Sequence, residues 1–442
     1  MFLTFSFVAA LVAPWKIWVR ALIGLQAIVT VMVINWSQAR QGLLSFGLGA
    51  GIFLIIWIWQ KNRLLGRIAS VGGILSFLLA LAGIFQKGPL THYLYKGSVT
   101  VRGFYWRAGI KMFLHHPWFG VGPDRYGAWF RSYRPAQYPM NYGYDLTSTA
   151  AHNVIIQIFA TCGVFVGVAY LALLGFVIYR GAVAIRKNQG TNRLLIAGLL
   201  AAWVGYQSQS IVSIDNIGIA IWGWVLSGIV IGVSLIDLPQ DGAINAKLVK
   251  RQLSLNSFKP IISGAFVLAF LFLIIPQYRG ESNTFHLSSF AVPTPAQGQA
   301  NREAYHQVVV GDVTIPMLNP QYRLLMASDL AQAGYVDEGF AQINKEIAAD
   351  PRDYGALGME ASFYEQLHKY NEAIVNRIKM YALDPWGARN LLQLGNDYLA
   401  IGDKVSAKKY GQIILDMRKF GRPDPTSQYI AIEQQAKTQL GA

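Results

Sequence analysis

The sequence predicts an all-α protein in which a polytopic helical membrane part precedes a C-terminal α-solenoid of helix pairs. The first two thirds contain long apolar runs, although mean hydropathy over the 442 residues is only +0.32. About 20 helical residues cross the hydrocarbon core of a bilayer, so runs of this length are typical of transmembrane helices. From about residue 320 the pattern changes to soluble amphipathic helix that repeats every 34 residues.

Eight membrane spans are expected in the apolar part of the chain. They lie at residues 2–14, 19–36, 43–59, 68–85, 153–179, 194–212, 216–236 and 260–277. The first run lacks a basic segment before it, so we expect the tail of a span rather than a cleavable signal. The predicted organisation is N-terminal transmembrane helices at 1–85, an extracytoplasmic loop at 86–152, transmembrane helices at 153–277, a linker at 278–319 and repeats at 320–442.

Basic residues concentrate in alternate joins between the spans. They follow the first, third and fifth spans and precede the last. The positive-inside rule places these joins in the cytoplasm, so the loop at 86–152 and the repeats face the opposite side. Much of the net charge of +15 lies in these short joins, which argues against nucleic-acid binding. The single cysteine, Cys162, provides neither a disulfide framework nor a cysteine-based metal site.

The loop segment Ser98–Asn153 is cationic and aromatic, which suggests an anionic ligand. Its charged residues include Arg102, Arg107, Arg125, Arg131, Arg134 and Lys111 against only Asp124 and Asp145. Residues 98–116 are expected to form a helix in the membrane interface, which Pro117 ends. The aromatic run from Tyr126 to Tyr133 suits an interfacial belt better than a sugar-stacking wall.

Several residues of this segment are candidates for substrate binding. Residues four apart share a helix face, so Arg102 and Trp106, with Arg107 one position on, could look partly toward one cavity. Arg125 adds positive charge after the turn that follows the helix.

The predicted topology brings ionisable residues from distant parts of the sequence to the outer membrane face. Arg40, Arg102, Arg107, His152 and Asp215 all fall at or near it. Ionisable groups at such depths are costly and are usually paired or functional. Two of them have simpler explanations. Asp215 could cap a helix in a tight turn, and Arg40 could be an interfacial residue whose side chain reaches the headgroups.

Other motifs favour structural explanations. The glycine run at 47–51 lies inside a span and lacks the strand and lysine of a phosphate loop, so it indicates close helix packing. His115 and His116 are adjacent and cannot sit on one helix face, so no metal site is predicted. Asp350–Pro351 recurs 34 residues later as Asp384–Pro385. This period resembles about three tetratricopeptide repeats, which either bind a partner protein or only cap or dimerise the membrane part.

The loop and its flanks carry motifs of a known family. They are an arginine four residues before a tryptophan (Arg102 and Trp106), a Pro-x-x-Gly-x-Gly turn at 117–122, and His152–Asn153 at the start of a span. A serine and an arginine, Ser37 and Arg40, end an earlier span, and S-I-D occurs at 213–215. With these motifs, residues from about 30 to 236 resemble the O-antigen ligase/polymerase superfamily of bacterial envelope enzymes.

The resemblance implies an all-helical, multi-pass glycosyltransferase of the C type in the bacterial inner (plasma) membrane. Such an enzyme transfers a glycan from a polyprenyl-diphosphate carrier to a glycan, lipid or protein acceptor outside the cytoplasm, and it needs no cofactor. By the same resemblance, His152 corresponds to the essential loop histidine, Arg102 to the arginine before the tryptophan, and Arg40 to the span-end arginine. Asp215 matches the late acidic position.

The implied chemistry suits these residue types. A diphosphate leaving group develops negative charge that arginines stabilise through bidentate contacts. The attacking hydroxyl needs a base such as His152, because histidine titrates near neutral pH. A carboxylate such as Asp215 could orient that histidine. The simpler explanation is that His152 is a polar helix cap, a role that Asn153 could fill instead.

Other interpretations stay open. The family usually has more spans than the eight expected here, so we expect that N-terminal spans are missing. Either the reading frame is truncated, or the protein is a shorter variant whose cavity is closed differently. A protein O-oligosaccharyltransferase of the same fold would use the repeats to present polypeptide acceptors. A non-catalytic membrane scaffold would use them to recruit an envelope partner. A transporter is disfavoured, because the sequence lacks the paired broken-helix segments of inverted repeats.

Overall fold

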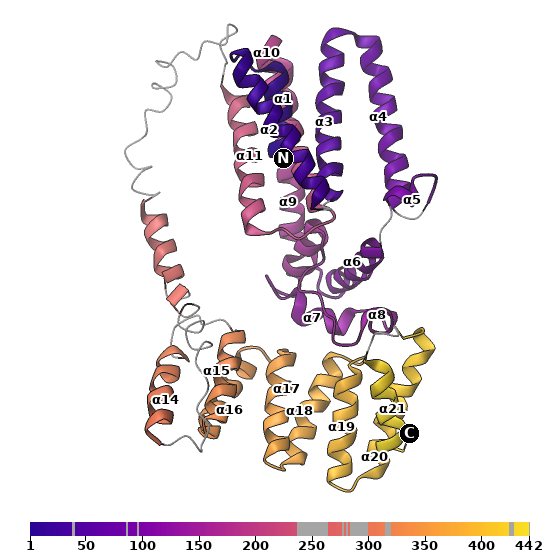
Figure 1. Cartoon of the computed structure of the whole chain (residues 1–442), viewed down its shortest axis with the longest axis vertical. Helices are drawn as coiled ribbons and strands as arrows, with labels where there is room; N and C mark the ends of the chain where they lie inside the picture. Colours follow the sequence, from indigo (N-terminus) through magenta and orange to yellow (C-terminus); the bar gives the residue numbers. More distant parts are fainter. Residues whose placement is uncertain are drawn as a thin grey trace. The chain divides into compact units, whose positions relative to one another are not determined.

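The described structure is entirely helical. The computed structural model describes residues 1–37, 40–84, 87–94, 97–236, 264–275, 278–279, 282, 299–313, 320–423 and 428–441. Every element of regular secondary structure in these ranges is a helix, which confirms the predicted fold class (Figure 1). Most of the predicted linker at 278–319 lies outside the described residues.

The chain divides into two compact units. The first contains Met1–Tyr133 and Ser148–Arg251, and the second contains Arg134–Thr147 and Gln252–Ala442. Part of the predicted extracytoplasmic loop, residues 134–147, therefore groups with the C-terminal helices rather than with the membrane helices.

The first unit is a bundle of long helices with a loop region before α9. Its helices are α1 (Phe2–Val12), α2 (Ile17–Trp36), α3 (Arg40–Lys61), α4 (Arg63–Ile84), α5 (Thr91–Leu94), α6 (Gly97–His115), α7 (Tyr126–Tyr133), α9 (Val154–Lys187), α10 (Gly190–Ser210) and α11 (Ile217–Leu235). Among the described residues, α2, α3, α4, α9 and α11 are long and apolar enough to cross a membrane. These five correspond to five of the eight predicted spans.

The other three predicted spans are helical but differ from the five. α1 has 11 residues, and Gly264–Ile275 is also a short apolar helix. α10 has 21 residues, but polar side chains such as Arg193, Gln207 and Gln209 lie near its ends. An apolar run in the sequence therefore does not always correspond to a helix that is both long and uniformly apolar.

α10 is the buried centre of the first unit. It packs against α1, α3, α9 and α11. The side chain of Trp203 is 1% exposed, and its indole N–H donates a hydrogen bond to Ser227 Oγ at 2.8 Å. A Cβ on Gly49 of α3 would lie 2.8 Å from the carbonyl oxygen of Ala201, so α3 and α10 meet where only glycine fits. Gly49 thus serves helix packing as predicted, whereas a Cβ at Gly47 or Gly51 would meet open space.

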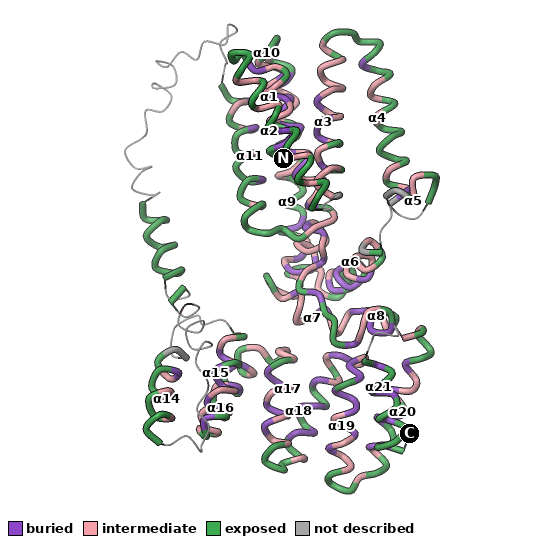
Figure 2. Tube along the Cα trace, viewed as in Figure 1, coloured by how far each residue is buried: buried purple, intermediate pink, exposed green. Residues whose placement is uncertain are grey.

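The outward surface of the first unit is apolar. α2, α4 and α11 expose large apolar side chains along much of their length (Figure 2). Ile17, Leu64 and Ile217 are 76%, 65% and 84% exposed. Apolar surface of this extent is unfavourable in water, whereas a bilayer covers it and helices satisfy their own backbone hydrogen bonds there. The first unit therefore has the surface of a multi-pass membrane protein.

α9 is interrupted at Gly163, where the backbone is non-helical with φ 76° and ψ −172°. The loop at 117–122 fills the break. Three backbone hydrogen bonds of 2.8–2.9 Å join them: Val121 N to Ala160 O, Gly122 N to Thr161 O, and Val164 N to Pro117 O. Unpaired backbone groups at membrane depth cost several kcal/mol each. The inserted loop therefore makes the interruption of this helix possible.

The second unit contains helix pairs that repeat every 34 residues. Its helices are α8 (Gln137–Tyr142), α14 (Gln299–Val313), α15 (Pro320–Gln332), α16 (Val336–Ala349), α17 (Tyr354–Gln366), α18 (Tyr370–Leu383), α19 (Ala388–Ala400), α20 (Lys404–Asp416), the 3-10 helix η2 (Met417–Phe420) and α21 (Tyr429–Gln439). α15, α17 and α19 begin 34 residues apart. The turn inside each pair has a left-handed residue at the same position, Gly334, His368 and Gly402. The predicted period is therefore present in the backbone.

A cluster of buried charged side chains joins two of these helix pairs. Arg377 of α18 forms ion pairs with Glu365 at 2.5 Å and with Asp397 at 3.4 Å. Burial and the neighbouring Glu365 raise the pKa of Asp397 to about 7, although Arg377 opposes the rise. Asp397 of the folded protein therefore keeps its proton at mildly acidic pH.

Substitution of Gly163 by alanine should destabilise the first unit. A Cβ there would lie 2.1 Å from the carbonyl oxygen of Trp118 at a positive φ, so we expect Gly163→Ala to cost more than about 1 kcal/mol. Thermal unfolding of the detergent-solubilised protein measures this loss. Gly175→Ala in the same helix is the control, because a Cβ at Gly175 meets open space. Equal melting temperatures for the two variants would contradict the joint at Gly163.

Stability of the helix pairs should fall as the pH rises from about 4 to about 7. The folded-state pKa of Asp397 is raised, so its stabilising contribution is complete below the unfolded-state pKa and is lost as the pH passes about 7. Hydrogen exchange of α17–α19, corrected for intrinsic rates, should show this slope in the wild type and a flatter one in Asp397→Asn. Asp416→Asn should keep the slope, because Lys419 lowers the pKa of Asp416 and leaves it ionised throughout.

Candidate functional site

α6 carries much of the predicted site and is held against the start of α9. A Cβ on Gly109 would lie 2.7 Å from the side chain of Ile156, so glycine allows the close approach of the two helices. α6 ends at His115, shortly before Pro117, as predicted. The turn after Pro117 is the loop that fills the break in α9. α6 is therefore fixed to α9 both along its length and through the loop that follows it.

Arg102 of α6 meets the N-terminal end of α3. With the Gln41 amide oriented so that its oxygen faces the guanidinium, that oxygen accepts hydrogen bonds from Arg102 Nη2 at 2.6 Å and Nη1 at 3.2 Å. Gln41 directly follows Arg40, the first residue of α3. The contact brings the chain positions of two predicted diphosphate ligands together, whereas the side chain of Arg40 lies outside what the structure describes.

His152 lies where the loop enters α9. Its φ of +52° is left-handed, a conformation that costs a non-glycine residue about 1–3 kcal/mol and is frequent at functional sites. The cap of α9 is made by Asn153, whose side-chain oxygen accepts the Ile156 N–H at 3.0 Å. Because Asn153 fills that role, helix capping does not account for the histidine.

The imidazole of His152 stacks on Tyr105 of α6. The ring centroids are 5.2 Å apart and the planes meet at 28°. Tyr105 is itself fixed, because its carbonyl accepts a hydrogen bond from Tyr126 Oη at 2.6 Å and its ring packs edge-on against Phe130. Burial, and then the positive charge of Arg102, hold the pKa of His152 below its usual range. The imidazole is therefore neutral near neutral pH and can accept a proton.

The other predicted residues of the loop have different surroundings. Arg107 is exposed, its Nε donates to the carbonyl of Gly103 at 3.3 Å, and its guanidinium lies 4.4 Å from the ring centroid of Phe104. Trp106 and Arg125 are half-buried. The substrate-binding roles of these three residues stay predictions.

Asp215 is engaged at the join between α10 and α11. Its Oδ1 accepts a hydrogen bond from Tyr206 Oη at 2.8 Å. The cap of α11 is the next residue, Asn216, whose side chain accepts the Gly218 N–H. Asp215 is thus not the residue that caps this helix. The ring that stacks on His152 is that of Tyr105. A role of Asp215 in substrate binding stays a prediction.

Two charged residues of the cationic loop are neutralised within the second unit. Arg134 forms an ion pair with Asp384 at 2.7 Å, and Asp145 forms one with Arg389 at 3.2 Å. Arg134 is therefore not available to an anionic ligand, whereas the net charge of the rest of the loop is unchanged because Asp145 is neutralised as well.

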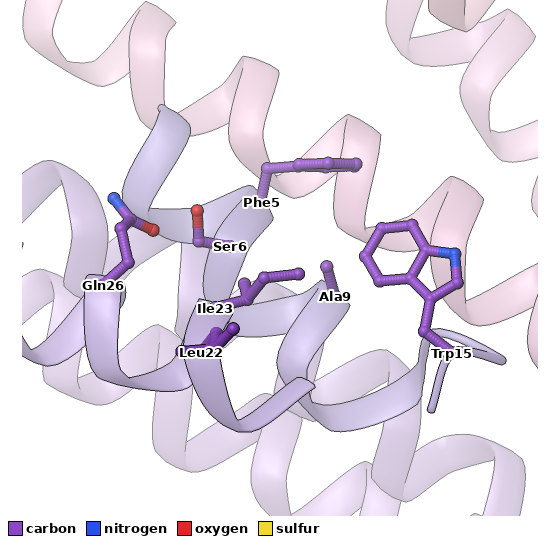
Figure 3. A pocket seen from close by; sticks show the side chains of 7 residues that line it. All are labelled: Phe5, Ser6, Ala9, Trp15, Leu22, Ile23 and Gln26. Carbon is purple, nitrogen blue, oxygen red and sulfur yellow. The ribbon is translucent and has the colours of Figure 1, made fainter. Parts of the chain in front are cut away.

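The described residues of the predicted site include no metal cluster, and none of them lines the hollow that the structure shows in the first unit. Within the described ranges, no three His, Cys, Asp or Glu side chains could hold a metal ion. A hollow of about 280 Å³ lies between α1 and α2 (Figure 3). Its lining is mainly apolar, with Phe5, Trp15 and Ile23, and its polar members are Ser6 and Gln26. Such a lining suits a hydrocarbon chain and not a diphosphate.

The sequence did not point to Gln41 or Tyr105, which contact the two central residues. Each nevertheless had a positional signal. Gln41 follows a predicted ligand, and Tyr105 lies three residues after Arg102, about one helical turn away. A fixed cation and a neutral base in one region can stabilise an anionic leaving group while a proton is removed from a nucleophile.

Comparison with protein families bears on this region of the first unit. Residues 25–171 match the O-antigen ligase family. The match covers about a third of the chain and contains Arg40, Arg102 and His152, whereas Asp215 and the repeats fall outside it. It supports the superfamily resemblance and a glycosyltransferase-like function at the level of the family. A comparison with curated proteins finds no match.

Loss of the charge of Arg102 should raise the pKa of His152. A neighbouring cation disfavours the protonated imidazole, so Arg102→Gln should move the titration of His152 to higher pH. Nuclear magnetic resonance of the histidine-labelled protein measures this pKa, with His152→Ala to assign the signal. Arg107→Gln removes an exposed charge that lies over Phe104 and should leave the pKa unchanged. A larger shift in Arg107→Gln than in Arg102→Gln would contradict the described geometry.

Proposed function

We propose that the protein is a membrane glycosyltransferase that moves a glycan from a polyprenyl-diphosphate carrier to an acceptor hydroxyl in cell-envelope polysaccharide assembly. The observation that carries the proposal is the placement of Arg102 and His152. Arg102 meets the start of α3, and its charge lowers the pKa of His152. Both residues lie in the part of the chain that matches the O-antigen ligase family.

The proposed reaction is a displacement at the anomeric carbon of the donor sugar. The acceptor oxygen forms a bond to this carbon as the bond to the diphosphate oxygen breaks. His152 takes the proton of the acceptor hydroxyl, and its depressed pKa keeps it in the neutral form that can do so. Arg102, assisted by Arg40, stabilises the negative charge that develops on the departing diphosphate.

The proposed setting is the bacterial inner membrane. The five apolar helices and the exposed apolar surface of the first unit suit a bilayer. The pattern of basic joins in the sequence predicts that the loop and the repeats lie outside the cytoplasm. A carrier lipid in the same membrane would present its diphosphate at the outer interface, where Arg102 and His152 are also predicted to lie.

Carrier-lipid release tests the proposal directly. The protein is reconstituted in liposomes with a polyprenyl-diphosphate-linked oligosaccharide and an acceptor glycan, and released carrier is measured. We expect His152→Ala and Arg102→Ala each to lower the rate by at least about 100-fold, because each removes a group that acts in the transition state.

Two matched substitutions control for loss of folding. Arg67→Ala removes an exposed arginine of α4, and His115→Ala removes an exposed histidine at the end of α6. Both should insert and release carrier like the wild type. Undiminished release by His152→Ala and Arg102→Ala would refute the assignment of these residues, and no release by the wild type with any lipid-linked glycan would refute the function.

A further inference from the structure

Residues 134–147 are packed into the C-terminal helices. This segment includes α8 and belongs to the second unit, although the chain on both sides of it belongs to the first. Met140 and Tyr144 are 1% and 3% exposed, and they share an apolar core with Leu391 of α19 and Ile414 of α20. The apolar core of the C-terminal helices therefore includes side chains of residues 134–147, which are not part of the helical repeat.

Arg134 ties the two ends of this segment together. Its Nη1 donates to the carbonyl of Leu146 and its Nη2 to the carbonyl of Tyr144, both at 3.0 Å. The guanidinium therefore closes the segment into a loop. Its side chain is 0% exposed, and a charge buried to this extent is unfavourable unless another charge compensates it.

Asp384 supplies the compensating charge. Its two carboxylate oxygens accept hydrogen bonds from Arg134 Nη2 at 2.8 and 2.7 Å, and its own side chain is also 0% exposed. Removal of one member of a buried pair leaves the other uncompensated and is strongly destabilising. The closed form of the segment thus depends on a residue that lies 250 positions later.

A second set of contacts holds the far end of the segment. Tyr144 Oη donates to Gln428 Oε1 at 2.9 Å. Arg389 Nη2 donates to Tyr144 Oη at 3.1 Å and pairs with Asp145 at 3.2 Å. These contacts come from the start of α19 and from the residue before α21, so separate elements of the C-terminal helices hold the segment.

The 34-residue repeat identifies what is special about Asp384. Asp350 occupies the equivalent Asp-Pro turn one repeat earlier. The two aspartates accept backbone N–H groups in the same way, from Arg352 at 3.0 Å and from Trp386 at 3.3 Å. The shared turn role is therefore separable from the pairing of Asp384 with Arg134.

We propose that the C-terminal repeats act as a clamp on the chain's own loop and thereby position His152. The segment held by the clamp ends at Thr147, and only four residues separate it from His152. Ser148 and Ala151 in this short connection are 5% and 0% exposed, and the Ala151 N–H donates to Gln157 Oε1 at 2.7 Å. Because the connection is only four residues long, we expect release of the clamped segment to disturb it and the left-handed His152 that follows.

The clamp and its effect on the site are separate parts of this proposal. The effect on transfer rests on the proposed function, whereas the clamp itself does not. In this role Arg134 and Asp384 are positioning residues, because they act on the site through the loop.

Hydrogen exchange of the full-length protein in lipid nanodiscs tests the clamp. In Asp384→Asn, amides of residues 136–147 should exchange at least about tenfold faster than in the wild type, because the buried guanidinium loses its counter-charge. Asp350→Asn is the matched control and should leave these amides as protected as in the wild type. Asp384→Glu keeps the charge and should recover part of the protection. Tyr144→Phe removes only the hydroxyl contacts and should give a smaller increase in the exchange rate of these amides. This variant tests the clamp if Asp384→Asn does not fold.

Transfer kinetics on the same variants test the positioning. Asp384→Asn should lower kcat at least about tenfold and leave KM for the lipid-linked donor nearly unchanged, because the donor ligands on α3 and α6 are intact. Unchanged exchange in Asp384→Asn and Tyr144→Phe, or an equal rise in Asp350→Asn, would overturn the clamp. Faster exchange with an unchanged kcat would overturn the positioning. If the wild type transfers no glycan, the proposed function fails, and the exchange comparison still decides the clamp.

Discussion

The backbone hydrogen bonds between the loop at 117–122 and the interrupted α9 are the constraint on which the site depends. α6 ends just before this loop, and His152 lies just before α9, so a joint near Gly163 fixes the helix that carries Arg102 relative to the helix that follows His152. Without the loop, free carbonyl and amide groups in the middle of a span would be prohibitively costly. The stacking of Tyr105 on His152 is therefore maintained by a joint that lies in the span itself.

Local signals in the sequence were sufficient for much of the fold. The end of α6 follows from Pro117, the close packing at Gly49 follows from glycine, and the 34-residue period follows from recurring turn residues. The break in α9 could not be predicted, because Gly163 lies in an uninterrupted apolar run and its φ depends on a loop about 40 residues earlier. The sequence predicted more spans than there are long apolar helices in the described residues. In composition, a buried helix or a short helix can resemble a membrane-spanning helix.

Only part of the candidate site could be inferred from the sequence, because local patterns do not encode how side chains pack. The predicted topology assigned Arg40, Arg102 and His152 to one membrane face. In the structure, Arg102 contacts the start of α3 and lowers the pKa of His152, and Tyr105 stacks on His152. Their partners depend on side-chain packing that no local pattern encodes. A count of charged residues in the sequence is also not sufficient. Arg134 resembles a ligand for an anion in the sequence, but in the structure it forms an ion pair with Asp384.

The excursion of residues 134–147 into the second unit has a consequence for how such a protein could arise. The chain passes from one unit to the other after Tyr133, after Thr147 and after Arg251. A domain that is simply appended to a chain is joined to it by one crossing, and it can be gained or lost by a single genetic fusion or truncation. Here, deletion of the C-terminal helices would also strip the loop of its apolar core and leave Arg134 without Asp384. The repeats and the loop are therefore expected to have changed together, as one inherited unit.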